Sequence, residues 1–270
     1  AKIYAEKPLR DYTKVIQYCD EVKADGFDLV DDFSDLFGMN AAGTDAKMRN
    51  TKESILEAQF TSGAGNWCTW MFGRDLVNWN NNFTWAKWVT PSRDLISAFK
   101  QEGDEVRFKE SIVYYDCNWS NYYPSDNYPF MYKCRSANSS IIKYRYADVL
   151  LLKAEALIMQ DTPDLEGAAD IIDEVRDRAK LGALPTSVRS NKNVLLNALL
   201  KERRLELAFE GQRWFDLVRL DKVEEVMNAV YAKDSGRKAQ IYTFDKNSYR
   251  LPIPQSVIDA NDKIHQNPGY

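Results

Sequence analysis

The sequence predicts a mostly α-helical fold, in which pairs of helices are interrupted by long irregular loop insertions. Two observations carry this prediction. Apolar residues recur at helical spacing near the N-terminus and again through residues 144–219. Residues 61–88, in contrast, are rich in glycine, asparagine and threonine, a composition that excludes a long regular element. We therefore expect a helical scaffold that carries its irregular segments as insertions.

Composition places the chain among globular proteins and excludes several partners. Of its 270 residues, 44% are hydrophobic, which is ample for the core of one large domain or two ordinary ones. The 36 basic and 40 acidic residues give a net charge of −4 with both signs interspersed, so we expect neither nucleic acid nor an anionic membrane surface as a partner. No segment approaches the roughly 18 apolar residues of a membrane-spanning helix.

The first helices are predicted within residues 1–30. Residues 1–6 have the pattern of the end of a helix, which Pro8 terminates. Residues 11–24 place their apolar side chains on one helical face, and Gly26 is positioned to stop this second helix. Two helices joined by a tight turn form the unit of a tetratricopeptide fold.

Residues 31–142 are the least regular part of the chain. A short extended segment is expected at residues 53–60, and an aromatic loop rich in tyrosine and proline at residues 114–132. Thr90 can cap a helix that begins at Pro91. The buried face of that helix should comprise Leu95, Ile96 and Phe99.

A second helix pair is predicted from residue 144 to residue 179, with Gly182 ending it. The apolar face of its first helix comprises Tyr144, Ala147, Leu151, Ala154 and Ile158, and that of its second helix Ala168, Ile172, Val175 and Ala179. The string Asp-Glu-Val occurs in the second helix of both pairs, at 20–22 and 173–175. This offset, 173 − 20 = 153 residues, is not a multiple of the roughly 34-residue tetratricopeptide repeat, so long insertions separate the repeats.

The densest alternation of apolar and charged residues lies between residues 195 and 219. Gly211 can adopt the positive φ that closes a helix, and Trp214 begins the next one. After residue 250 the prolines leave room for one short helix, at residues 255–261.

Three blocks of this sequence resemble the SusD/RagB family of surface nutrient-binding lipoproteins, which partner TonB-dependent transporters in Bacteroidetes. They are the helix YRYADVLLLKAEAL at 144–157, the segment 202–220 with ELAFEGQRWFDLVRL, and the tail 251–270. Residues 90–107 form a weaker fourth block, which ends in Gly103-Asp104-x-x-Arg107. The resemblance implies a tetratricopeptide-like α-α superhelix.

The resemblance also implies that residues 1–270 are the C-terminal part of one SusD-like domain. Within it we expect tetratricopeptide-like helices at 1–30, a loop-rich insertion with a candidate ligand loop at 31–142, and a family-like helical core and tail at 143–270. If earlier helices are missing, apolar surface should be uncovered near Tyr4, Tyr12 and Val15.

A tryptophan-rich loop is the candidate ligand site. Five of the seven tryptophans fall within residues 61–88, among polar residues that offer them no evident apolar partner. An exposed indole leaves apolar surface in contact with water unless a ligand covers it. Sugar rings present flat C–H faces that pack on aromatic planes. The candidate ligand-binding residues are Trp67, Trp70, Arg74, Asp75, Trp79 and Asn81. The alternative is that some of these tryptophans belong to the core.

Catalysis and metal binding are not expected. Glu202, Glu206 and Glu210 recur every four residues and share a helix face. They could serve a glycosidase, but a buried ion-pair network with Arg203, Arg213, Arg176 and Arg178 is the interpretation we favour.

His265, the only histidine, lies far from all four cysteines, which argues against a zinc site. No motif for a nucleotide cofactor is present. We therefore expect the protein to use no cofactor. Cys117 and Cys134 could form a disulfide, although free thiols are favoured.

The resemblance implies a non-enzymatic protein that binds an oligosaccharide at the outer membrane and delivers it to a SusC-like TonB-dependent transporter. Its only membrane attachment would be a lipid anchor in the N-terminal part of the full-length protein. Two alternatives remain open. One is a peptide-binding member of the same family, and the other is a tetratricopeptide scaffold that binds a protein in its helical groove.

Overall fold

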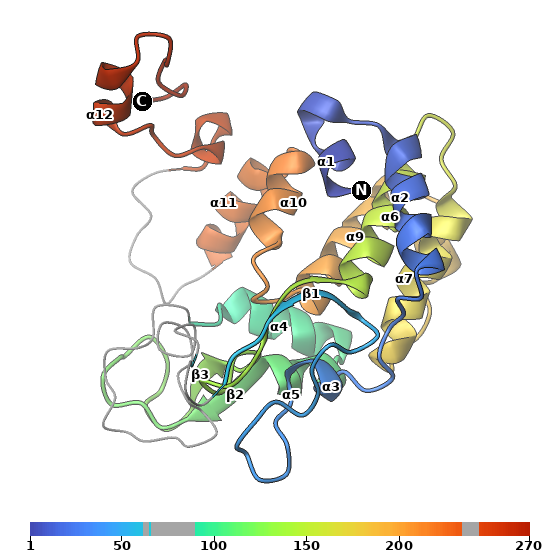
Figure 1. The fold of residues 1–270 in the computed structure, drawn as a ribbon, viewed down its shortest axis with the longest axis vertical. Coiled ribbons are helices and arrows are strands. Elements are labelled where there is room, and N and C mark those ends of the chain that lie inside the picture. Colours follow the sequence, from blue (N-terminus) through green and yellow to red (C-terminus); the bar gives the residue numbers. More distant parts are fainter. Residues whose placement is uncertain (62–64, 66–89, 234–242) are drawn as a thin grey trace. The chain divides into compact units, whose positions relative to one another are not determined.

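The structure is a computed structural model of the chain, and it describes residues 1–61, 65, 90–233 and 243–270. These residues form two compact units, Ala1–Arg213 and Trp214–Tyr270. Helices predominate in both units, which confirms the predicted mostly α-helical fold (Figure 1). Within the described ranges, no helix combines the length and the apolar character that crossing a membrane requires.

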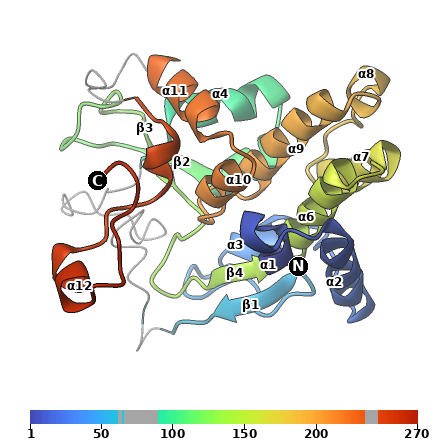
Figure 2. The ribbon, with the colours of Figure 1, turned by 90° about the horizontal axis from the view of Figure 1, so that it is seen from above.

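The first unit is built on a layer of antiparallel helices (Figures 1 and 2). Its helices are α1 (Lys2–Ala5), α2 (Tyr12–Ala24), α6 (Tyr146–Met159), α7 (Leu165–Arg178) and α9 (Lys192–Glu206), with the short η1 (Lys7–Leu9) and α8 (Thr186–Arg189) beside them. Helix α6 packs against α2, α7 and α9. It can do so because Ala147, Ala154 and Ala156 are fully buried and let neighbouring helices approach closely.

The predicted apolar faces of α6 and α7 are confirmed with one exception. The predicted residues Ala147, Leu151, Ala154, Ile158, Ala168, Ile172 and Val175 are buried in one core with Leu195 and Leu199 of α9. Ala179 is buried as well. Tyr144 was wrongly placed on this face, since it lies in a strand before α6 and is 45% exposed. Helix α7 also ends earlier than expected, because Lys180 rather than Gly182 adopts a positive φ.

The surface near the N-terminus agrees only in part with the expectation of an uncovered patch, since Ile3 and Leu9 are exposed there. Val15 is fully buried, because α6 supplies Leu152 and Ala156 as its packing partners. Tyr4 and Tyr12 are half-buried against the same cluster. The predicted exposure of Val15 is therefore wrong.

Two small antiparallel sheets flank the helical layer. Strand β1 (Ser54–Ala58) pairs with β4 (Ile141–Arg145), which confirms the extended segment expected near residue 53. Strand β2 (Ile112–Tyr115) pairs with β3 (Tyr128–Met131), so that Ile112 lies opposite Met131. Residues 116–127 of the predicted aromatic loop form the connection of this hairpin, and the prediction was wrong only at the ends of the segment, which belong to the two strands.

Two helices precede this hairpin. Ser92 caps α4 (Arg93–Glu102) by accepting a hydrogen bond from the N–H of Leu95, so the helix begins two residues later than predicted. Gly103, with φ 70°, closes it. Asp104 then caps α5 (Glu105–Ser111), which leads directly into β2. The predicted face of Leu95, Ile96 and Phe99 is buried together with Ile112 and Leu205.

Two further features surround the end of α9. The short helix α3 (Ser34–Phe37) and the residue before it place Phe33 and Phe37 in a separate apolar cluster. Helix α9 ends at Glu206, and Phe209 and Gly211 take positive φ values of 67° and 77° before α10 (Arg213–Arg219) begins. Gly211 takes the predicted positive φ between the two helices, but α9 ends five residues before it, so the glycine does not itself close that helix.

The second unit consists of helices and loops, and hydrogen bonds from side-chain amides connect them. It contains most of α10, then α11 (Val223–Lys233), η3 (Lys246–Tyr249) and α12 (Gln255–Ala260). The Asn228 side chain bonds both the N–H and the C=O of Phe244, each at 2.9 Å. Gln266 does the same to Ile253, at 2.8 and 2.9 Å. The helix predicted at residues 255–261 is confirmed to within one residue.

Candidate functional site

The ligand-binding residues predicted from the sequence lie outside the part of the chain that the structure describes. They are Trp67, Trp70, Arg74, Asp75, Trp79 and Asn81. Their assignment stays a prediction. The described residues present a different candidate on the β2–β3 hairpin.

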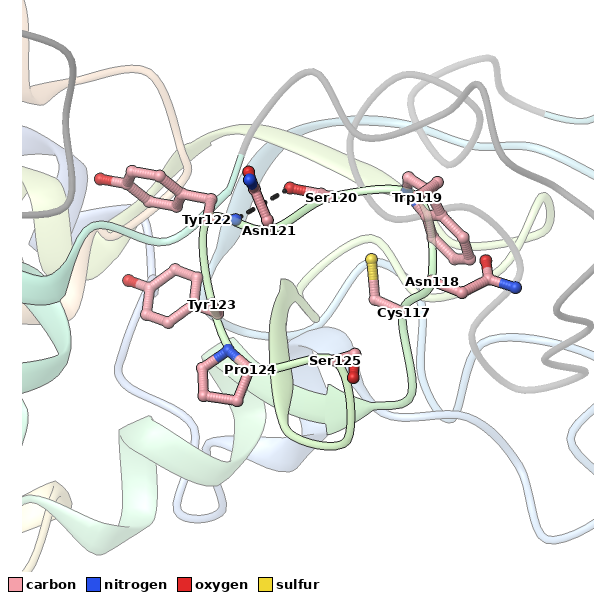
Figure 3. Close-up of a pocket in the computed structure, with 9 residues that line it drawn as sticks. All are labelled: Cys117, Asn118, Trp119, Ser120, Asn121, Tyr122, Tyr123, Pro124 and Ser125. Atoms are coloured by element: carbon pink, nitrogen blue, oxygen red, sulfur yellow. Dashed lines mark hydrogen bonds between the residues drawn. The ribbon is translucent and has the colours of Figure 1, made fainter.

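Residues 117–125 form a compact loop between β2 and β3, which we call the aromatic loop. The N–H of Cys117 donates to the carbonyl of Ser125 at 2.6 Å, and this bond closes the two ends of the loop. The loop surrounds a cavity of about 720 Å³, and its nine residues line the cavity (Figure 3). A cavity of this volume is in the range of small-molecule sites.

The lining combines aromatic rings with neutral hydrogen-bonding groups. The aromatic residues are Trp119, Tyr122 and Tyr123. The polar ones are Asn118, Ser120, Asn121 and Ser125, which offer amide and hydroxyl groups as donors and acceptors. Among the described lining residues none carries a charge. Such a surface suits a neutral, hydroxyl-rich ligand with flat apolar faces.

Strand β3 and the loop itself fix the aromatic rings in place. The Tyr122 and Tyr123 rings meet edge to face with centroids 5.1 Å apart, and Tyr123 meets Tyr128 in the same way at 5.5 Å. Trp119 packs on Phe130 with centroids 6.4 Å apart. Pairs of this geometry add stability beyond their buried area. The rings are therefore ordered before a ligand arrives.

The start of α4 braces the same loop. The guanidinium carbon of Arg93 lies 4.1 Å from the centre of the Tyr122 ring and 4.5 Å from that of Tyr123. Arg93 also donates a hydrogen bond to the carbonyl of Tyr122. The hydroxyl of Tyr123 donates to the carbonyl of Pro91 at 2.7 Å. The sequence alone shows that this segment is aromatic. The cavity follows only from the structure, in which the loop is closed.

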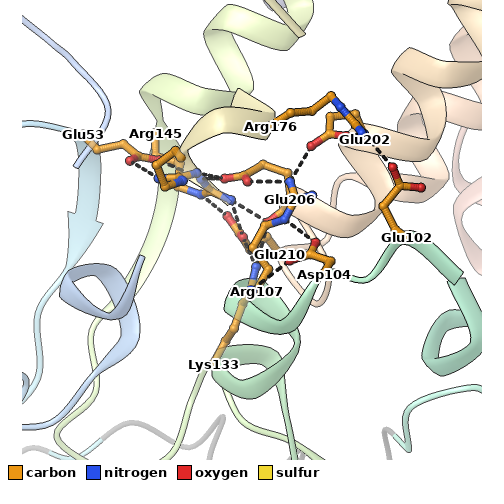
Figure 4. Close-up of polar contacts among 11 residues, drawn as sticks. Glu53, Glu102, Asp104, Arg107, Lys133, Arg145, Arg176, Glu202, Glu206 and Glu210 are labelled. Carbon is orange, nitrogen blue, oxygen red and sulfur yellow. Dashed lines mark hydrogen bonds and ion pairs between the residues drawn. The ribbon is translucent and has the colours of Figure 1, made fainter. Parts of the chain in front are cut away.

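The row of glutamates at the end of α9 is an ion-pair network, as predicted. Glu202, Glu206 and Glu210 are almost completely inaccessible to solvent. The Glu206 side chain pairs with three arginines, of which Arg107 is at 3.0 Å. The carboxylates of Glu53, Glu102 and Asp104 join the same cluster (Figure 4).

The cations of this network agree only in part with the prediction. Arg176 pairs with Glu202 at 3.2 Å, and Arg178 pairs with Glu206, as expected. Arg203 instead pairs with Asp148 of α6 at 2.7 Å, and Arg213 donates to a main-chain carbonyl. The sequence analysis missed Arg107, Arg145 and Lys133, which come from α5, β4 and the segment after β3. The only local signal was the spacing of Asp104 and Arg107.

The pKa shifts of these glutamates indicate that the network is a structural element. Burial alone would raise the pKa of Glu206, but Arg178, Arg145 and Arg107 lower it well below the ordinary value. Burial dominates at Glu202, whose pKa is raised. Each Glu206 oxygen accepts a hydrogen bond from an arginine, so this carboxylate is held within the network.

The structure also places the histidine and the two cysteines that the sequence analysis considered. His265 is exposed on the C-terminal tail. Cys117 and Cys134 are buried and are not bonded to each other, so the alternative of a disulfide between them is wrong. Within the described ranges, no cluster of histidine, cysteine and carboxylate residues could hold a metal ion.

Comparisons with known proteins agree on one family. The sequence profile of the SusD family matches residues 123–270. SusD-like protein P38 of Formosa agariphila is 43% identical over 99 residues, which are 34% of this chain and 19% of that protein. SusD-like protein P2 of the same organism is 36% identical over 143 residues, 50% of this chain and 27% of the relative.

Solved structures with the same fold are also SusD-like. A SusD homologue from Bacteroides thetaiotaomicron has a TM-score of 0.74 at 20% identity and covers 99% of this chain. A laminarin-binding SusD-like protein has a TM-score of 0.64 at 25% identity and covers 96% of this chain. Surface glycan-binding protein A from B. thetaiotaomicron, in complex with laminarihexaose, has a TM-score of 0.68 at 19% identity and covers 95% of it. This chain spans about 60% of the length of these three structures.

Proposed function

Because this chain belongs to the SusD family, we propose that it is a non-catalytic protein that binds an oligosaccharide at the outer cell surface. In the whole protein, a lipid anchor would attach it to the outer membrane, and a SusC-like TonB-dependent transporter would receive the ligand. The observation that carries the proposal is the cavity of the aromatic loop.

Physical chemistry favours a sugar in this cavity. The C–H faces of a pyranose ring can pack on Trp119, Tyr122 or Tyr123, while its hydroxyls reach the amides and hydroxyls of Asn118 and Asn121. The aromatic rings are already fixed by their neighbours, so little conformational entropy is lost on binding. Two solved relatives support the ligand class, one described as laminarin-binding and one bound to laminarihexaose.

The tryptophan loop at residues 66–82 is a second part of the proposal. Trp67, Trp70 and Trp79 would supply further stacking faces, and Arg74, Asp75 and Asn81 would bond sugar hydroxyls. Several stacking faces would suit a ligand of several sugar units.

The pocket between α2, α6 and α7 is small. It measures about 40 Å³, against about 720 Å³ at the aromatic loop. We therefore favour the aromatic loop over the helical groove as the ligand site among the described residues.

A glycan array with the full-length protein tests the proposal, and calorimetric titration of the glycan it identifies follows. Trp119→Ala and Tyr122→Ala should each weaken binding roughly thirtyfold, the effect of losing about 2 kcal/mol at an aromatic hot spot. Tyr18→Ala is the matched control, because Tyr18 is a partly exposed tyrosine stacked on Tyr4 near the N-terminus. A protein that binds peptides and no glycan would favour the alternative ligand class.

A further inference from the structure

The segments on both sides of the hairpin that carries the aromatic loop pair with carboxylates at the end of α9 and just after it. Strand β2 follows α5, whose Arg107 donates to Glu206 at 3.0 Å. Strand β3 ends at Met131, and Lys133, two residues later, pairs with Glu210 at 2.5 Å. The segment before β2 and the segment after β3 therefore both contact one buried charge cluster (Figure 4).

Lys133 is fixed from several directions. Besides Glu210, its ammonium group donates to the main-chain carbonyl of Glu206 at 2.9 Å, in the last turn of α9. The same ammonium lies 4.7 Å from the centre of the Phe37 ring and 5.2 Å from that of Phe33. The side chain is only 4% exposed. These contacts leave it little freedom to move.

The burial of this charge constrains both partners of the pair. Burial lowers the pKa of Lys133 from 10.5 to about 8, although Glu210 and Glu206 act in the opposite direction, and the nearby charge of Arg145 adds to the lowering. An apolar side chain at this position would remove one cation from Glu210 and leave Arg145, and the loss of one partner of a buried pair is destabilising. Lys133 therefore both stabilises the charge cluster and ties the end of the hairpin to it.

We propose that Lys133 is a positioning residue for ligand binding, whose contact with Glu210 fixes the direction in which the β2–β3 hairpin presents the aromatic loop. This inference rests on the proposed function, since orientation matters only to a bound ligand. The backbone bond from the N–H of Tyr132 to the carbonyl of Ser111, at 2.8 Å, extends the hairpin pairing to the residue next to Lys133. A shift at Lys133 is thereby passed to both strands.

Lys133→Met in the full chain tests the inference, because it removes the charge and both hydrogen bonds but keeps a long apolar side chain. The melting temperature should fall, because Glu210 loses one of its cationic partners and keeps Arg145. Amide hydrogen exchange in residues 112–131 should become about tenfold faster, while exchange in α6 stays as in the wild type. Laminarihexaose serves as the probe, and its Kd should rise about tenfold. Lys153→Met is the control, since it removes an ion pair with Asp20 away from the hairpin. It should change neither the hairpin exchange rates nor the Kd.

Two results would overturn the inference. One is a folded Lys133→Met variant whose hairpin exchange equals that of the wild type. The other is a lowered melting temperature with exchange increased equally in α6 and the hairpin, which would make Lys133 purely structural. If Lys133→Met does not fold, Lys133→Gln allows the same comparison. A wild-type chain that binds no glycan contradicts the proposed function, and the exchange comparison still decides whether Lys133 positions the hairpin.

Discussion

At the residue scale, Glu206 shows how a buried charge becomes a structural element. Its carboxylate sits among Arg107, Arg145 and Arg178, and its main-chain carbonyl accepts from Lys133. Removing one partner of such a group leaves the others buried and unpaired, which costs more than the pair itself contributes.

Glu206→Ala should therefore lower the free energy of unfolding by on the order of 3 kcal/mol. Urea denaturation followed by circular dichroism measures this change. Glu225→Ala is the control, since Glu225 is exposed and pairs only with Lys222 in the contacts that the structure gives. Ligand binding should survive wherever the variant folds. A fully stable Glu206→Ala variant that had lost hydrolysis of a glycoside would instead indicate an enzyme.

The tryptophans of the predicted ligand loop allow a second test at this scale. Trp67→Ala, Trp70→Ala and Trp79→Ala should each weaken glycan binding by about 2 kcal/mol while leaving the melting temperature in place, because stacking faces on polar loops serve the ligand. Titration calorimetry and a melting curve for each variant decide this. Unchanged affinity in all three would move the site elsewhere, and three strongly lowered melting temperatures would return these residues to the core.

At the scale of elements, local patterns predicted the helices and failed for the hairpin. The apolar spacing of α2, α6 and α7 is visible within each segment, and their buried faces matched the prediction closely. Strands β2 and β3 have only four residues each, and β3 includes Pro129, so they offer little alternation to detect. Their pairing across the aromatic loop is decided by tertiary contacts.

The same reason explains the mixed result at the ion-pair network and the site. The spacing of the glutamates was visible in the sequence, but Arg107, Arg145 and Lys133 reach them from elements 61 to 99 residues away. No local pattern reveals such a pairing. The cavity likewise depends on the single bond between Cys117 and Ser125 that closes the aromatic loop.

The N-terminus of α7 gives a prediction for one element. Asp164 caps this helix by accepting from the N–H of Gly167 at 2.9 Å. Asp164→Ala should cost about 1 kcal/mol of stability, because that N–H loses its partner. Chemical denaturation measures the loss, and Asp161→Ala, on the exposed turn before the cap, is the control. Equal effects of the two substitutions would contradict a capping role.

At the scale of the whole molecule, the carboxylate network ties stability to pH. Burial alone would raise the pKa values of Glu206 and Glu210, but Arg178 and Arg145 at Glu206, and Arg145 and Lys133 at Glu210, lower both. The unfolded chain then binds protons more readily than the folded one, so these groups stabilise the fold above their ordinary value of 4.5. That contribution is lost as pH falls below it. Burial raises the pKa values of Glu202 and Asp104, which act in the opposite sense and offset part of the loss.

The melting temperature should accordingly fall as pH is lowered from about 5 to about 3, the window below the ordinary carboxylate pKa. Differential scanning calorimetry at closely spaced pH values measures this slope. Glu206→Gln cannot titrate at this position, so its slope should be shallower than that of the wild type, whereas Glu225→Gln, on the exposed surface, should leave the slope unchanged. A Glu206→Gln slope equal to that of the wild type would show that acid unfolding is set by other carboxylates, and that the network at the end of α9 does not control the stability of the fold in acid.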